Sequence, residues 1–260
     1  FDIGGAFAGE CLINRAGALV ANNSGMFTIG SGMDMRVDNY GTITNAGTFK
    51  IQGASAGRGL FNRDGAVVTS TAGTFEIGGG NTIQVENDGK ITNSGTFKIF
   101  GTSSGDDLIN RDTVINNAGG TFSVENGEAR ILDNSGYVYN AGTLNLRFCS
   151  GDFVVDEAVL NQANAKIINA ASSSFKVGNS NTTRLMTNHG LLQIDGDADI
   201  STCSGAGLLN TPTGTVNVRD SLSAGGCLNY AITNENIFTL GSAGILAVKF
   251  VSGQGFINSG

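Results

Sequence analysis

The feature that most constrains this chain is an asparagine that recurs along its whole length at near-constant spacing. Two residues before each copy lies an apolar side chain such as Leu12 or Val37. The copies are Asn14, Asn39, Asn62, Asn87, Asn110, Asn134, Asn161, Asn188, Asn210, Asn234 and Asn258. A period of roughly 24 residues sustained over a whole chain is the signature of a solenoid or a repeat array. The sequence therefore predicts one continuous body over residues 1–260.

Within a repeat, the residues alternate between two types. In residues 37–51 (VDNYGTITNAGTFKI) every second residue is apolar, small or asparagine, and most of the residues between them are polar. A period of two predicts β-strands with one buried face. The N-x-G steps at 39–41 and 45–47 predict corners, because Asn and Gly tolerate the backbone conformations that turns require. A helical solenoid is excluded, because no segment has a helical period and Gly, Asn and Thr are poor helix formers.

Two related repeat patterns alternate along the chain. The first recurs at 37–51, 85–99 and 132–146, and the second, in which Asn14 and Asn62 are one residue further from the next Gly, recurs at 12–20, 60–68 and 108–116. The alternation fits two kinds of coil, either one repeat of roughly 24 residues in two types or a double repeat of roughly 48 residues with two related halves.

The charges favour the shorter coil. With a single asparagine repeat in each coil, Tyr40 and Asp88 separate Arg15, Arg63 and Arg111, which would repel one another if they were stacked directly. The predicted fold is all-β: a single parallel β-solenoid of about ten to eleven coils in two alternating types, with roughly 24 residues in each coil. Its asparagines are expected to stack and to hydrogen-bond along the axis, as they do in cross-β stacks.

The repeat is loosest near 147–158 and 178–185, within the two longest intervals between asparagines. We expect loops to bulge from the rod there, since insertions in solenoids map to surface loops that often form the contact face.

Composition limits the partners and the location. The net charge is −7 and no basic stripe is present, which argues against nucleic acid as a partner. No apolar run is long enough to span a membrane. The chain begins with Phe1 rather than Met, so we expect either a removed leader or a fragment. Four cysteines in a charge-poor chain favour a secreted, extracellular or cell-surface location.

Two of the cysteines share a position in the repeat. Cys203 lies seven residues before Asn210, and Cys227 lies seven residues before Asn234. Stacked positions are about 4.8 Å apart, within the Cα range of a disulfide. We predict a Cys203–Cys227 disulfide, with two stacked free thiols as the alternative. Cys11 and Cys149 are too distant to pair within one chain, so each is expected to be free or to link subunits.

No catalytic, metal or cofactor site is predicted. His189 is the only histidine, and the default for it is a surface side chain. Asp195, Asp197 and Asp199 resemble a loose Ca²⁺ ligand set, but the final Glu of a calcium loop is missing, so a solvated acidic turn is expected. A polysaccharide-acting enzyme would need clustered carboxylates in a cleft, and ice binding would need a regular threonine array, and both rank below a structural role.

The strings GTITNAGTF (41–49) and GKITNSGTF (89–97) resemble the repeats of secreted β-helical adhesins, such as autotransporter passenger domains and filamentous-haemagglutinin-like proteins. The resemblance covers most of residues 10–146 well and the remainder loosely. It implies a secreted or cell-surface protein with a structural or adhesive role, and it carries no catalytic residues to this chain.

Both ends of the sequence stop within a repeat. FDIGGA matches the second half of a coil and GFINSG matches the first half, and neither shows a cap. One interpretation is head-to-tail stacking of subunits, with contacts through Phe1, Asp2 and Ile3 at one end and Phe256, Ile257 and Asn258 at the other. The alternatives are an excised piece of a longer repeat protein and a capped monomer. The partial coils at the two ends do not add up to a whole coil, so part of a coil would be missing at such a junction. Lateral overlap of subunits is therefore a further option.

The expected function is therefore that of a subunit in a head-to-tail extracellular filament or surface fibre, with the chain itself as partner. The alternative is the binding region of a longer adhesin with a cell-surface or glycan receptor.

Overall fold

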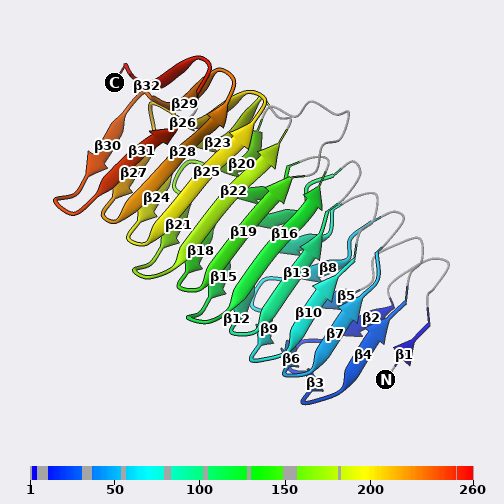
Figure 1. Ribbon diagram of the computed structural model, residues 1–260. Coiled ribbons are helices and arrows are strands. Elements are labelled where there is room, and N and C mark those ends of the chain that lie inside the picture. The colour runs from blue at the N-terminus through cyan, green and yellow to red at the C-terminus, as the bar shows by residue number, and fades with distance from the viewer. Residues whose placement is uncertain are drawn as a thin grey trace.

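The computed structural model describes residues 2–4, 11–30, 37–53, 57–78, 83–101, 105–127, 130–148, 157–180, 183–249 and 251–259. These residues form a rod of three long parallel sheets, here called A, B and C (Figure 1). Each coil contributes one strand to sheet B, then one to sheet C, then one to sheet A. The predicted parallel β-solenoid is confirmed.

The strands of each sheet follow one another in coil order. Sheet A consists of β1 (Asp2–Ile3), β4 (Met26–Ile29), β7 (Thr48–Ile51), β10 (Thr74–Ile77), β13 (Thr96–Phe100), β16 (Thr121–Gly127), β19 (Thr143–Phe148), β22 (Ser174–Ser180), β25 (Asp197–Cys203), β28 (Ser221–Cys227) and β31 (Ile245–Lys249). Sheet B consists of β2 (Leu12–Asn14), β5 (Val37–Asn39), β8 (Leu60–Asn62), β11 (Val85–Asn87), β14 (Leu108–Asn110), β17 (Leu132–Asn134), β20 (Glu157–Asn161), β23 (Arg184–Asn188), β26 (Ala206–Asn210), β29 (Tyr230–Asn234) and β32 (Gln254–Asn258). Sheet C consists of β3 (Leu19–Asn22), β6 (Thr42–Asn45), β9 (Val67–Ser70), β12 (Lys90–Asn93), β15 (Thr113–Asn116), β18 (Tyr137–Asn140), β21 (Lys166–Asn169), β24 (Leu191–Ile194), β27 (Thr215–Val218) and β30 (Ile237–Leu240).

The strand register decides between the two coil lengths. Asn39 lies opposite Asn14 on one side and opposite Asn62 on the other. Each physical coil is therefore one asparagine repeat of about 24 residues, and the coil made of a double repeat is excluded.

The core is built from columns of like side chains. On sheet A the rings of Phe27, Phe49, Phe75, Phe97 and Phe122 stack with centroids 4.7–4.8 Å apart and nearly parallel planes. A parallel in-register sheet places identical residues one strand spacing apart, and that spacing suits ring stacking. Columns of isoleucine, valine and leucine from all three sheets complete the buried interior.

The corner between sheets B and C has two lengths. Strand C begins three residues after the ladder asparagine in the short form, as from Asn39 to Thr42, and five residues after it in the long form, as from Asn14 to Leu19. A short corner passes close beneath a long one, where a Cβ on Gly41 would lie 2.4 Å from the carbonyl oxygen of Ala18. Only glycine fits such an approach.

The corner that starts at Asn110 departs from the alternation. The sequence groups residues 108–116 with the long pattern, but strand β15 begins at Thr113, so this corner is short. Three short corners therefore follow one another, at Asn87, Asn110 and Asn134, before the next long corner at Asn161.

The expected bulges fall mainly on residues 149–156 and 181–182, which lie outside the described residues. The described residues on either side of them belong to strands β19, β20, β22 and β23, apart from Thr183.

Candidate functional site

The asparagines of sheet B form a hydrogen-bonded ladder that points in one direction. Each side-chain amide donates from Nδ2 to Oδ1 of the asparagine on the following coil, over 2.7–2.8 Å, from Asn14 through to Asn258. The same nitrogen also contacts a backbone carbonyl of the next coil, as Asn87 does at Thr113. The rungs from Asn39 to Asn234 are buried, so these bonds form out of water, where an unpaired partner would be costly.

A second ladder, absent from the sequence prediction, follows the ends of the sheet C strands. Its amides pair at 2.7–2.9 Å from Asn22 to Asn45, and from Asn93 onward to the last rung, Asn169. Ser70 occupies the rung between Asn45 and Asn93. The signal for this ladder was present, because a second asparagine follows the first by six residues in several repeats, as in Asn39 and Asn45.

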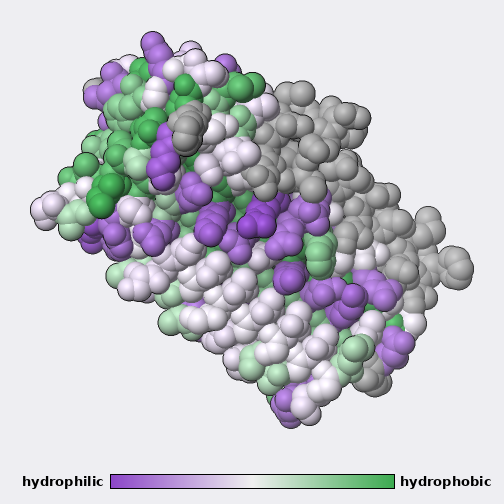
Figure 2. All heavy atoms as spheres, viewed as in Figure 1, coloured by the Kyte–Doolittle hydropathy of each residue, from purple (hydrophilic) through white to green (hydrophobic). Residues whose placement is uncertain are grey.

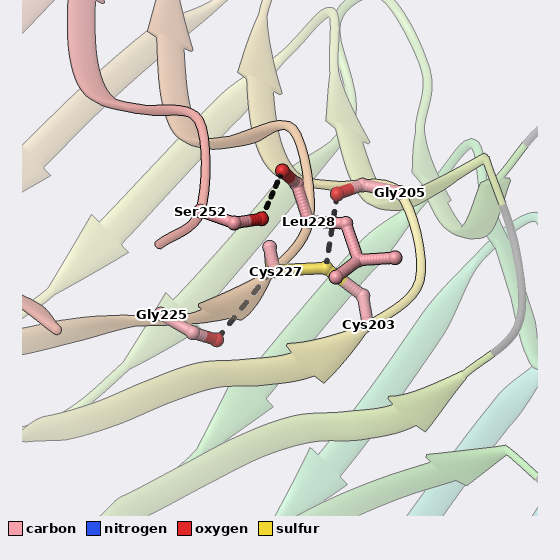
Figure 3. The surroundings of a disulfide bond; sticks show 6 residues. All are labelled: Cys203, Gly205, Gly225, Cys227, Leu228 and Ser252. Carbon is pink, nitrogen blue, oxygen red and sulfur yellow. Dashed lines mark hydrogen bonds between the residues drawn. A yellow bond between two sulfur atoms is a disulfide. The ribbon is translucent and has the colours of Figure 1, made fainter. Parts of the chain in front are cut away.

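The predicted disulfide joins Cys203 and Cys227, with a Cα–Cα distance of 4.6 Å. These residues end strands β25 and β28 on adjacent coils, and both are buried. Figure 3 shows the bond, with the hydroxyl of Ser252 donating to the carbonyl of Leu228 at 2.7 Å beside it. The link ties together two C-terminal coils. Cys11 is half-buried, and Cys149 lies outside the described residues.

Ion pairs connect successive coils on the outer face of sheet B. Arg63 binds the buried carboxylate of Asp38 through two bonds of 2.6 and 3.0 Å, and its guanidinium lies 5.1 Å from the ring of Tyr40. Arg111 likewise binds Glu86 on the preceding coil and Asp88 at 2.8 Å. The arginines thus lie two coils apart, as the charge argument predicts.

A second group of charges surrounds Arg130. Its guanidinium contacts Asp133 and Glu157 at 3.0 Å and Asp106 at 3.7 Å. Burial raises the pKa of the Asp106 carboxyl, and the nearby Arg130 opposes part of that rise. The hydrogen bond from Arg63 to Asp38 raises the pKa of that guanidinium, and Asp88 acts in the same way on the pKa of Arg111.

His189 is held by a local contact, and of the expected acidic turn only Asp195 lies in a turn, because Asp197 and Asp199 belong to strand β25. Nδ1 of His189 lies 2.9 Å from the hydroxyl of Thr211. Asp195 lies 3.5 Å from Arg219, and Asp197 accepts a hydrogen bond from Ser221. Among the described residues no group of His, Cys, Asp or Glu is arranged to hold a metal ion.

A shallow groove, here called the corner trough, follows the corner between sheets B and C. One hollow of about 510 Å³ is lined by Arg111, Asp112, Ser135, Gly136, Tyr137, Asn164, Lys166 and Ile168. A second of about 400 Å³ is lined by Asn164, Ala165, Lys166, His189, Gly190, Leu191, Thr213 and Thr215. The two hollows share Asn164 and Lys166, so they meet at one ridge. Sequence reasoning did not identify this feature.

Large exposed apolar side chains gather at the two ends of the rod. In the described chain they are Ile13, Leu19 and Met26 in the first coil, Tyr40 in the second, and Leu228, Tyr230, Ile237, Leu240, Ile245, Val248 and Phe256 in the last coils. On the face shown in Figure 2, apolar residues gather where the C-terminus lies, while residues of intermediate or hydrophilic character cover the strands between the ends.

The predicted subunit-contact residues lie at these ends. Asp2 is exposed and Ile3 half-buried in β1, Phe256, Ile257 and Asn258 lie in β32, and Phe1 lies outside the described residues.

Compared with protein-family models, with curated proteins and with solved structures, the chain gives no match in any of the three searches. In the part of the chain that the structure describes, no helix is long and apolar enough to cross a membrane.

Proposed function

We propose that this protein is a structural subunit of an extracellular fibre, in which β-solenoid rods stack head to tail. The observation that carries the proposal is the polarity of the asparagine ladder. Among the described residues, Asn14 begins the ladder as a donor only and Asn258 ends it as an acceptor only. A copy stacked in the same orientation brings a donor to an acceptor, whereas head-to-head contact brings like groups together.

The ends of the rod give independent support. Leu19 lies in register with Thr42, and Met26 with Thr48, at positions that face outward. At the other end Ile237 lies in register with Thr215, and Ile245 with Ser221. Outward positions that are hydroxylated on the neighbouring coil are thus apolar near both ends. Clustered exposed apolar residues mark interaction surfaces. These residues face outward from the terminal coils, so they border the ends that a head-to-tail contact would join, and a non-closing contact between two different ends builds a filament.

The repeating charges also support a structural role. Arg63 and Arg111 each hold an acidic residue of the preceding coil, so these groups are used to fasten coils to one another.

Negative-stain electron microscopy of the purified chain tests the proposal. We expect filaments with an axial repeat on the order of 50 Å, one rod length. The double variant Leu19→Thr with Met26→Thr should shorten or abolish them. Val67→Thr, at an outward position of the third coil, is the matched control and should leave them intact. Separate rods at high protein concentration, in wild type and variants alike, would contradict the proposal.

The corner trough favours a second candidate, a binding region of a secreted surface protein. This role is compatible with the first, since the trough lies on the side of the rod and not at its ends.

A further inference from the structure

The depth of the corner trough follows from the two corner lengths. The long corner Asn161–Lys166 protrudes as a ridge, and Asn164 at its tip has a positive φ of 67°. On one side lie the consecutive short corners at Asn110 and Asn134, which leave the first hollow. On the other side the short corner at Asn188 leaves the second hollow before the next long corner at Asn210. From Arg111 to Thr213 the trough spans five coils, or about 20 Å.

An aromatic platform borders the first hollow. Tyr137 and Tyr139 are two residues apart on β18, so both rings face outward, with centroids 6.3 Å apart and planes 25° from parallel. Ile115 and Ile168 lie in register on either side of Tyr139 and extend the platform. Burial raises the pKa of the Tyr137 phenol, and neighbouring Tyr139 adds to the rise, so the Tyr137 ring stays neutral at physiological pH.

The trough offers donors and acceptors of both kinds. The exposed carboxylate of Asp112 accepts a bond from the hydroxyl of Thr113 and keeps further acceptor capacity. Lys166 and Asn164 project from the exposed ridge. His189 lines the second hollow, beside the exposed Thr213, whose hydroxyl donates to the His189 carbonyl at 3.0 Å.

This combination fits one ligand class. A pyranose ring presents an apolar C–H face that stacks on an aromatic ring, and its hydroxyls require donors and acceptors together. A long open groove suits a linear polymer better than a compact molecule. Arg111 forms ion pairs with Glu86 and Asp88. The other charged residues that line the trough are Lys166 and Asp112, one of each sign. The trough therefore has no excess of one charge that would attract a polyion. Strand β18 is paired on both sides, so it cannot take up a peptide as an added strand.

We propose that the corner trough binds a linear neutral glycan, with Tyr137 and Tyr139 as the stacking platform and Asp112, Asn164, Lys166 and His189 as its hydrogen-bonding partners. The proposal gives a ligand class to the second candidate function and rests on it, but it does not depend on axial stacking. It places the contact surface on the corner rather than on the expected bulges.

The test is a titration of the purified chain with cellohexaose, chitohexaose, mannohexaose and laminarihexaose, with a heparin hexasaccharide and an unrelated hexapeptide as competing classes. Binding is followed by calorimetry and by tyrosine fluorescence, which is usable because the chain has no tryptophan. We expect at least one neutral hexasaccharide to bind. Tyr137→Ala with Tyr139→Ala should weaken its affinity at least tenfold.

The matched control is Thr42→Ala with Thr44→Ala, at the equivalent outward positions of β6, which should bind like wild type. Lys166→Gln and His189→Gln leave the tyrosine platform intact and should each weaken glycan binding several-fold. They therefore test the proposal even if the tyrosine variant does not fold. Binding of no neutral glycan, tighter binding of the heparin or peptide probe, or unchanged affinity in the trough variants would overturn the proposal. Filament formation in the tyrosine variant reports separately on axial stacking.

Discussion

The side-chain amide of Asn110 donates to Asn134 over 2.8 Å, and Asn134 does not donate back. The same direction holds at all ten contacts of the sheet B ladder, so the rod has a donor end and an acceptor end. Each internal rung satisfies two neighbours at once, and the rungs from Asn14 to Asn234 are buried. The ladder therefore stabilises the stack and also gives it a polarity.

Removing an internal rung should be costly. In Asn110→Ala the amide of Asn87 loses one of its two acceptors and the oxygen of Asn134 loses its ladder donor, both in the buried interior. An unsatisfied buried polar group costs roughly 1–3 kcal/mol, so we expect the variant to lose at least about 2 kcal/mol in the free energy of unfolding. Urea titration followed by circular dichroism measures the loss.

The second ladder supplies a graded control for that experiment. Asn93→Ser should lose less stability than Asn93→Ala, because Ser70 already occupies the preceding rung of the same ladder. Asn258→Ala, at an exposed end, should lose less than about 1 kcal/mol. Equal losses at Asn110 and Asn258 would show that the buried ladder contributes no special stability.

The phenylalanine stack should respond to volume more than to aromaticity. Phe75 is fully buried between Phe49 and Phe97, and its truncation to Ala should cost about 3–5 kcal/mol. Phe75→Leu should cost much less, because Leu144 fills the same column next to Phe122. Denaturant midpoints of the two variants test this order, and a leucine variant as unstable as the alanine one would contradict it.

The disulfide should stabilise the C-terminal coils. Cys203→Ser with Cys227→Ser removes a link that closes a loop of about one coil, which is worth about 3 kcal/mol in the chain-entropy account. Hydrogen exchange should show faster opening in strands β28 to β32 than in β7 to β13. Uniform protection from hydrogen exchange along the rod in the double-serine variant would argue against local stabilisation by the disulfide.

Asp106 should make stability depend on pH. Its carboxyl pKa is raised by burial, so the folded state favours the protonated form. The stabilising effect is complete below the unfolded pKa of about 4 and is lost as pH rises through the folded value. Asp106→Asn should therefore gain stability relative to wild type between about pH 3 and pH 7. Urea midpoints of the two proteins at both pH values measure the gain, and a constant difference would refute it.

The sequence predicted the parts of this fold that depend on strict periodicity. The spacing of Asn14, Asn39 and their successors determined the coil, and the phase of Cys203 and Cys227 determined the disulfide. The second ladder was missed because Ser70, Ile194, Val218 and Leu240 occupy rungs of its column, so no unbroken series of asparagines marks it.

The corner trough was not predictable from spacing alone. It depends on the corner after Asn110 being short, although residues 108–116 share the letters of the long pattern. Its lining comes from five coils, and only the register brings Tyr137, Lys166 and His189 to one corner.

Engineered cysteines test the polar stacking of rods most directly. In a background with Cys11 and Cys149 replaced by serine, we would combine Asn14→Cys with Asn258→Cys and oxidise the purified protein. Cys203 and Cys227 show that stacked residues of adjacent coils can form a disulfide in this fold. Head-to-tail stacking predicts a ladder of covalent oligomers on a non-reducing gel for the double variant, and none for either single variant. Dimers from Asn258→Cys alone, or no oligomers from the double variant, would contradict it.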